Sequence, residues 1–417
     1  MEEPRGLRGS FVSFKYRDYR LLFISSLVTQ LGTEFLNVSN AWQIWALTGS
    51  ALHLGLTGIA RGVPVILFSL VGGVIADRFD RRKIIVYTQL ATGGLALLLA
   101  FLTVAGLVEV WHIYAVVFLN NTIQSASNPA RRAVLATVVP HEHLMNAMVL
   151  NSLVMQADRI GAPALAGVLI ALVGTPLTYT LNGLAHLVNA VTLLFIVTNL
   201  TPTRSASSPI RDLVEGLTFV RQHSIILVVL LMDAALMLVG NHQVLLPVLA
   251  DHYGVGPVGF GLLGSATAVG SIGAATTLLS LGNFKHKGYL IAGACLAYSG
   301  FLAMLGLAPW FTVALVAVAG LGLTNSLQAQ TRNVLIQLLT PDALRGRVTS
   351  FQSILQQGSP SLGQAILGGA AAAMGAGPAL VAGALICGAI NLGIVLTRKD
   401  LRAEDLGELH PRPTPVS

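Results

Sequence analysis

The amino-acid sequence predicts an all-α integral membrane fold, with twelve transmembrane helices arranged in two six-helix, pseudo-symmetric bundles. Three observations support this prediction. Of the 417 residues, 54% are hydrophobic and only 10% are charged, whereas roughly 25% of a soluble globular domain is charged. The hydrophobic residues form long runs between short polar turns, and Lys and Arg gather at alternate turns. Because backbone groups in lipid must hydrogen-bond within their own segment, these runs are expected to be helices.

Each hydrophobic run is long enough to cross a bilayer, which takes about 20 residues. The turn after the first run, Thr48-Gly49-Ser50, has no positive charge, whereas the turn after the second, around Asp77, is short and strongly basic. The predicted spans of the first half are 21–47, 54–76, 84–106, 112–139, 144–173 and 177–198. The predicted spans of the second half are 224–250, 258–281, 288–308, 311–339, 348–374 and 378–397.

Residues 199–223 form the longest internal break and are expected to be a cytoplasmic linker. Ser208-Pro209 is typical of a helix start, with an N-cap followed by a proline at the first helical position. The apolar residues that follow repeat at helical spacing, which favours an amphipathic helix on the membrane surface; a flexible linker with chance periodicity is the alternative. The sequence thus divides into 1–198, 199–223, 224–397 and a proline-containing tail, 398–417, that we expect to be disordered.

The distribution of positive charge predicts the topology. All but two of the 25 Lys and Arg residues fall on one side of the predicted spans, Arg332 among them; the two exceptions, Arg61 and Arg159, lie inside spans. Cytoplasmic loops are the ones enriched in Lys and Arg. We therefore expect an even number of spans with both termini in the cytoplasm. The net charge of +7 is explained by these turns and does not indicate a nucleic-acid partner.

An internal repeat supports two related halves. Arg132-Ala-Val-Leu135 recurs half a chain further on as Arg332-Asn-Val-Leu335, and Pro140 has a counterpart in Pro341. Parallel repeats of six spans each are a known plan of secondary transporters.

Five ionisable residues fall inside predicted spans: Glu34, Arg61, Asp158, Arg159 and Asp233. Each costs about 2.5–3.5 kcal/mol at mid-bilayer unless it is paired or faces water. Glu34 and Arg61 have matching depths, so an ion pair between them is plausible. Asp158 could instead face Arg61, while Arg159 could face Glu34; Asp233 is alone in the second half.

A carboxylate near mid-membrane can take up or release a proton as its surroundings change. Glu34, Asp158 and Asp233 are therefore the candidates for proton coupling. The alternative is that these charges only pair with one another and fix helix packing.

Uncharged polar residues add a candidate cavity. Asn37, Asn40 and Gln43 follow Glu34 at steps of three, which places them along one side of a helix. Such residues can line a wet cavity, or they can simply hydrogen-bond neighbouring helices. The other cavity candidates are Arg61, Gln124, Gln156, Arg159 and His242.

No phosphate-binding loop, catalytic triad or cofactor fingerprint is present, and the His and Cys residues lack metal-ligand spacing. Cys295 and Cys387 both fall inside apolar runs and are expected to be small packing residues. The sequence therefore predicts no enzyme activity, no cofactor and no metal, and we expect a monomer.

The basic turn from Gly73 to Lys83 resembles the signature loop between spans two and three of the major facilitator superfamily. The family pattern has a glycine where this chain has Asp80. The resemblance implies that Asp77 locks a cytoplasmic gate by engaging the start of span eleven, near Arg347. The gate motif then comprises Gly73, Asp77, Arg78, Arg81 and Arg82.

Three further stretches, Asn128 to Arg132, Val139-Pro140 and Arg159 to Pro163, look like the branch of that superfamily with bacterial exporters of siderophores and drugs. This resemblance implies a bacterial inner-membrane transporter that exports an amphipathic or hydrophobic small molecule in exchange for protons, by alternating access. A lysophospholipid carrier of the same fold and a proton-coupled uptake symporter remain open, and a channel or membrane enzyme is disfavoured.

Overall fold

The structure is a computed structural model that describes the backbone of residues 9–198, 209–282, 284 and 286–398. The predicted tail falls almost wholly outside these residues. Within them every regular element is a helix, and no strand is present. The described chain forms two compact units.

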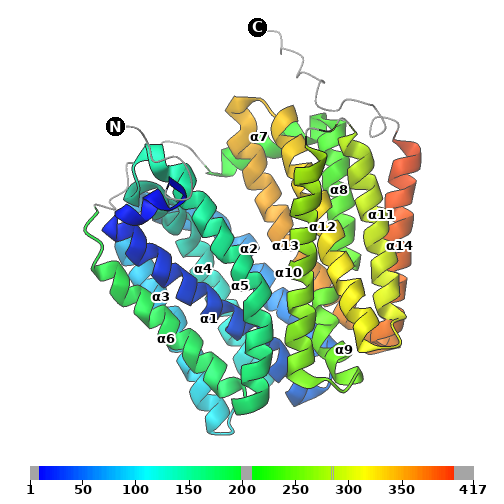
Figure 1. Ribbon diagram of the computed structural model, residues 1–417, viewed down its shortest axis with the longest axis horizontal. Helices are drawn as coiled ribbons and strands as arrows, with labels where there is room; N and C mark the ends of the chain where they lie inside the picture. The colour runs from blue at the N-terminus through cyan, green and yellow to red at the C-terminus, as the bar shows by residue number, and fades with distance from the viewer. Residues whose placement is uncertain (1–8, 199–208, 283, 285, 399–417) are drawn as a thin grey trace. The chain divides into compact units, whose positions relative to one another are not determined.

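Unit 1 comprises Met1–Gly49, Val63–Ala206 and Val255–Ser265. Its helix α6 packs against α1 and α3, α1 packs against α5, and α3 packs against α4, as Figure 1 shows for the helices of the first half. Its complete elements are η1 (Gly9–Lys15), α1 (Arg17–Thr48), α3 (Arg81–Val104), α4 (Val110–Val138), η2 (His141–His143), α5 (Leu144–Val173) and α6 (Thr175–Leu194).

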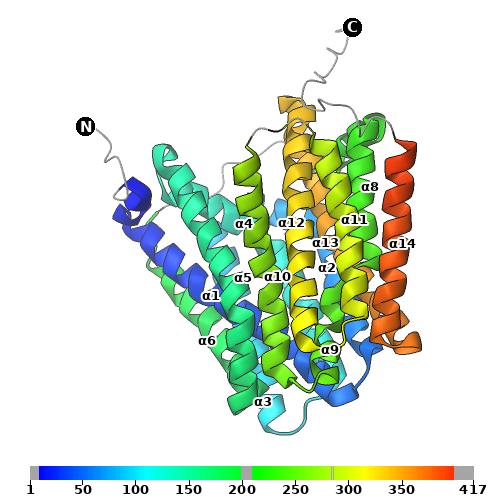
Figure 2. The ribbon, with the colours of Figure 1, turned by 45° about the vertical axis from the view of Figure 1, so that its right-hand side comes forward.

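Unit 2 comprises Ser50–Gly62, Ser207–Gly254 and Ala266–Ser417. Its helix α11 packs against α12 and α14, and α13 packs against α7, α8 and α14; Figure 2 shows α11, α12 and α14 side by side. Its complete elements are α7 (Pro209–Gln222), α8 (Ser224–Val239), η3 (His242–Leu245), α9 (Leu246–His252), α11 (Lys287–Gly306), α12 (Phe311–Leu339), α13 (Asp342–Met374) and α14 (Ala376–Thr397).

Two helices are divided between the units. The first part of α2 (Ala51–Arg78) belongs to unit 2, and the first part of α10 (Gly256–Leu281) belongs to unit 1. Glycines permit both associations: a side chain at Gly167 of α5 would overlap the carbonyl oxygen of Pro257, and Gly368 of α13 lies directly against Gly55. Such close backbone approach is typical of membrane helices. The predicted domain boundaries at 198, 223 and 397 stay predictions. The two units do not follow these boundaries, because the first part of α2 belongs to unit 2 and the first part of α10 belongs to unit 1.

Apart from span seven, each predicted span coincides with one helix, with ends that differ by a few residues. Nine helices in the described part are long and apolar enough to cross a membrane, and α4, α6 and α13 are not among them. These three carry more polar side chains, so the number of twelve spans stays a prediction. Span seven was predicted as one continuous helix, which is wrong: the chain leaves the α-helix after Val239, passes through η3 and resumes as α9.

The helix predicted after Ser208 is confirmed as α7. It packs on α13, where Gly216 lies against the carbonyl oxygen of Arg347 and Glu215 forms an ion pair with the Arg347 guanidinium. Its predicted place on the membrane surface stays a prediction.

Candidate functional site

Asp233 is not alone in the second half. Its carboxylate, on α8, forms an ion pair with Arg332 of α12, and the two residues are only 7% and 2% exposed. Arg332 was counted among the basic residues of the cytoplasmic side, and its side chain is buried in unit 2. The side of the membrane on which it lies stays a prediction. Charge compensation therefore explains how both groups are tolerated in the interior.

The Asp233–Arg332 pair has polar neighbours on α11. Cys295 and Tyr298 lie within electrostatic range of Asp233. Cys387 of α14 lies within electrostatic range of Cys295 and of Tyr298. The two cysteines are unbonded and buried. The interior of unit 2 thus contains a group of buried polar side chains around the ion pair that the sequence did not indicate.

Glu34 and Asp158 lie on neighbouring helices of unit 1. Asp158 on α5 is 5% exposed and lies within electrostatic range of Glu34 on α1, and α1 and α5 pack directly. Its Oδ2 atom has no hydrogen-bond partner among the described residues. Arg61, the partner predicted for Glu34, belongs to unit 2, so that ion pair stays a prediction.

The polar residues of α1 have different surroundings. Asn40 and Gln43 are buried, Asn37 is partly buried, and Gln43 Nε2 donates to Thr103 Oγ1 of α3 at 3.1 Å. This contact fits the helix-packing alternative for Gln43. Asn40 Oδ1 is buried without a partner among the described residues, so a polar ligand or water at Asn40 remains a prediction.

The remaining cavity candidates are spread over several helices. Gln124 of α4 accepts a hydrogen bond from the Ser127 hydroxyl at 3.3 Å, whereas Gln156 and Arg159 of α5 are exposed. His242 is buried beside Tyr298 in unit 2. In the described part of the chain, no group of three or more His, Cys, Asp and Glu side chains could hold a metal ion.

The gate motif spans the end of α2 and the start of α3. The backbone of Gly73, Asp77 and Arg78 belongs to α2, but their side chains lie outside the described part of the structure. Asp80 accepts a hydrogen bond from the Arg82 N–H at 2.8 Å. It therefore caps the N-terminus of α3, which gives a structural reason for an aspartate at this position.

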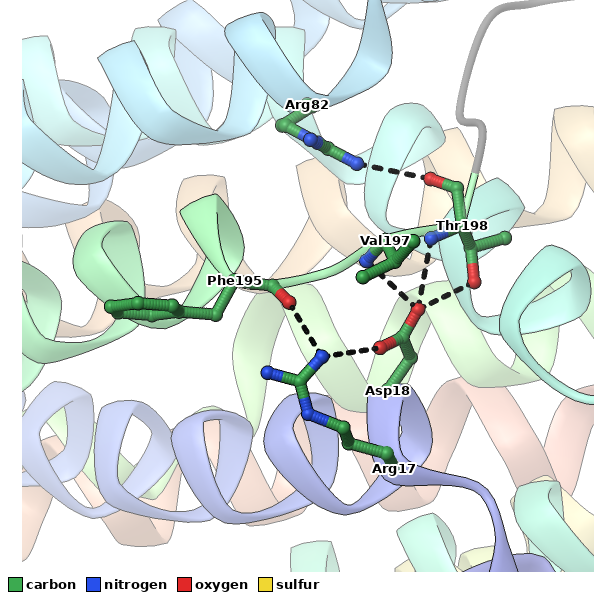
Figure 3. Close-up of polar contacts among 6 residues, drawn as sticks. All are labelled: Arg17, Asp18, Arg82, Phe195, Val197 and Thr198. Carbon is green, nitrogen blue, oxygen red and sulfur yellow. Dashed lines mark hydrogen bonds and ion pairs between the residues drawn. The ribbon is translucent and has the colours of Figure 1, made fainter.

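Arg82 of the gate motif reaches the exit of α6. Its Nη2 donates to the carbonyl oxygen of Thr198 at 3.0 Å. Oδ2 of Asp18, at the start of α1, accepts from the N–H groups of Val197 (3.0 Å) and Thr198 (2.9 Å) and from the Thr198 hydroxyl (2.7 Å), as Figure 3 shows. Helices α1 and α3 therefore fix the chain immediately before the predicted linker. The predicted engagement of Asp77 with the region near Arg347 stays a prediction.

Two further polar contacts, which were not predicted from the sequence, join α6 to its neighbours. His186 Nδ1 and Gln89 Oε1 of α3 are 2.5 Å apart, and Asn189 Nδ2 donates to Thr29 Oγ1 of α1 at 2.8 Å. All four side chains are buried. The sequence offered one signal of these contacts: His186 and Asn189 lie three residues apart, and so on one side of α6.

Known proteins resemble this chain over nearly its full length. The enterobactin exporter EntS of Shigella dysenteriae serotype 1 (strain Sd197) is 25% identical over 382 residues, which cover 91% of this chain and 90% of EntS. The EntS of Escherichia coli O1:K1 / APEC matches to the same extent. A bacterial homologue of the iron transporter ferroportin, in an inward-facing state, is similar in structure with a TM-score of 0.70, at 17% identity over 91% of this chain and 98% of that one.

The peptide transporter POT, in complex with sulfate, is also similar, with a TM-score of 0.73 at 12% identity over 95% of this chain and 96% of that one. At these identities the solved structures show the fold alone. The family described as transmembrane secretion effector matches residues 8–415. The chain is therefore a multi-pass membrane protein of the major facilitator superfamily and belongs to the transmembrane secretion effector family.

Proposed function

We propose that this protein exports an amphipathic or hydrophobic small molecule from a bacterial cytoplasm in exchange for protons, by alternating access. It would act as a monomer in the inner membrane, with both termini cytoplasmic. The observation that carries the coupling proposal is that Asp158 is buried on α5, which packs against the helix that carries Glu34, within electrostatic range of that residue. The exporter proposal is supported by the enterobactin exporters, which resemble 91% of the chain.

Two carboxylates in a poorly hydrated interior repel each other when both are ionised. A proton held by one of them relieves that repulsion, and a change in hydration can release it again. One elementary charge moved across 100 mV yields about 2.3 kcal/mol, so a single such site can drive uphill transport. Asp233 is the weaker candidate, because Arg332 already compensates its charge.

The similarity to the relatives supports a class of cargo, an amphipathic or hydrophobic small molecule, and does not identify a single compound. Enterobactin is the first compound to test, because the similar exporters are named for it. The open alternatives, a lysophospholipid carrier and an uptake symporter, give different results in the same experiment.

The experiment uses the purified full-length protein in proteoliposomes with an acidic interior. We expect enterobactin to accumulate inside, and the accumulation to stop when a protonophore dissipates the gradient; protein-free vesicles are the control. Accumulation of a labelled lysophospholipid but not of enterobactin would favour the lipid carrier. Accumulation that requires an acidic exterior would favour the symporter.

A further inference from the structure

Hydrogen bonds with two neighbouring helices stabilise the break in span seven, between α8 and α9. The Tyr298 hydroxyl of α11 donates to the carbonyl oxygen of Gly240 at 2.7 Å, and Asn241 Nδ2 donates to the carbonyl oxygen of Pro360 in α13 at 2.8 Å. Non-helical backbone at membrane depth is tolerated only where it is buried in protein or faces water. These two contacts stabilise the break, and all of these residues belong to unit 2.

The same contacts determine which nitrogen of His242 carries a hydrogen. The two oxygens of Tyr298 and Gly240 lie 2.7 Å apart, which requires the single phenolic hydrogen between them because a carbonyl cannot donate. His242 Nδ1 is 3.2 Å from the same hydroxyl, so Nδ1 must be the donor in that contact. Nε2 of the neutral ring is then the acceptor, with a free lone pair.

That lone pair is buried without a donor. His242 is 4% exposed, and its Nε2 atom has no hydrogen-bond partner among the residues that the structure describes. A buried polar atom that is left without a hydrogen bond destabilises the protein. A hydroxyl group is the simplest donor that would satisfy this lone pair.

We propose that the break between α8 and α9 is a binding site for a hydroxyl group, with Nε2 of His242 as its acceptor. Tyr298 is the positioning residue, because it holds Nδ1 as the donor and thereby keeps Nε2 free. The hydroxyl comes either from a bound water molecule or from the transported molecule, and only the second source rests on the proposed function.

Two variants distinguish the acceptor role of Nε2 from the hydrogen bond between Nδ1 and Tyr298. In His242→Asn the side-chain nitrogen can replace Nδ1 and still donate to Tyr298, but no acceptor reaches the position of Nε2. In His242→Gln the side-chain oxygen can replace Nε2 as acceptor, but the donor to Tyr298 is lost. A purely structural role for His242 would make His242→Gln at least as harmful as His242→Asn.

The direct test is nitrogen NMR of the full-length protein with ¹⁵N-labelled histidine in lipid nanodiscs, with the His242→Gln spectrum identifying the resonance. We expect a protonated Nδ1 and a non-protonated Nε2 whose resonance is displaced by an accepted hydrogen bond. In Tyr298→Phe we expect a mixture of both tautomers. A wild-type Nε2 that bears the hydrogen, or that shows a free lone pair both with and without enterobactin, overturns the proposal.

The source of the hydroxyl is read from two further measurements. A displaced Nε2 resonance that is present without cargo and unchanged by enterobactin identifies water. A displacement that appears only with enterobactin identifies the cargo, and His242→Asn should then raise KM for its transport about tenfold, whereas His242→Gln should raise it less. Because the spectrum does not depend on transport, failure of the export proposal leaves the water site testable.

Discussion

The Asp233–Arg332 pair shows what the sequence does and does not specify about single residues. Asp233 was identified as an ionisable group inside a predicted span, and it is a buried residue of α8. Its partner was missed because Arg332 lies two turns from the end of α12, where a long side chain could equally reach the membrane surface. Direction around a helix axis depends on the neighbouring helices, which one sequence does not reveal.

Removing one member of the pair should destabilise the protein strongly. Asp233→Asn leaves a buried arginine uncompensated, and Arg332→Gln leaves a buried carboxylate; each is expected to cost about 3–5 kcal/mol. The double variant removes both charges and should recover most of the loss. Thermal unfolding of the full-length protein in detergent measures the stability of the two single variants and of the double variant. Single variants as stable as the wild type would show that the ion pair is not formed.

At the scale of elements, hydrophobic runs predicted where helices lie, because burial in lipid requires both length and apolarity. The break in span seven was not predicted, although Gly240, Asn241 and Pro247 are all helix-disfavouring signals. The run from 224 to 250 is so apolar that its average hydropathy hid them. The break forms because hydrogen bonds from Tyr298 and to Pro360 compensate for the lost helical bonds.

Glycines determine how closely the helices of unit 2 pack. A Cβ added at Gly270 of α10 would overlap the carbonyl oxygen of Ala319 on α12, whereas one added at Gly293 of α11 would meet nothing within 4 Å. Gly270→Ala should therefore destabilise the protein by about 1–3 kcal/mol through overpacking. Gly293→Ala should be neutral or stabilising, since alanine favours helix. Equal melting temperatures for the two variants would contradict the packing described for α10 and α12.

At the scale of the whole molecule, composition predicted a helical membrane protein. The resemblance of the turn from Gly73 to Lys83 predicted a transporter of the major facilitator superfamily, and the family match confirms that superfamily. The division into units could not be predicted, because it depends on where the first parts of α2 and α10 pack. The orientation in the membrane was predicted from charge alone and is not tested by the structure.

Cysteine labelling tests that orientation. Leu107 follows α3 and is 61% exposed, and His141 begins η2 between α4 and α5 and is also exposed. In intact cells Leu107→Cys should react with a membrane-impermeant maleimide, and His141→Cys only after permeabilisation. The native cysteines are both buried, so the wild type serves as the unlabelled control. The reverse pattern would contradict cytoplasmic termini.

Coupling between cargo and proton movement is tested most directly by the pH inside proteoliposomes that contain the protein and a pH-sensitive dye. With an acidic interior and no membrane potential, adding enterobactin outside should raise the internal pH, because each cargo molecule entering drives protons out. In the double variant Glu34→Gln with Asp158→Asn, the pH should stay constant although radiolabelled enterobactin still exchanges across the membrane. A wild-type protein that moves enterobactin without any change in internal pH, or with acidification, would contradict proton-coupled export.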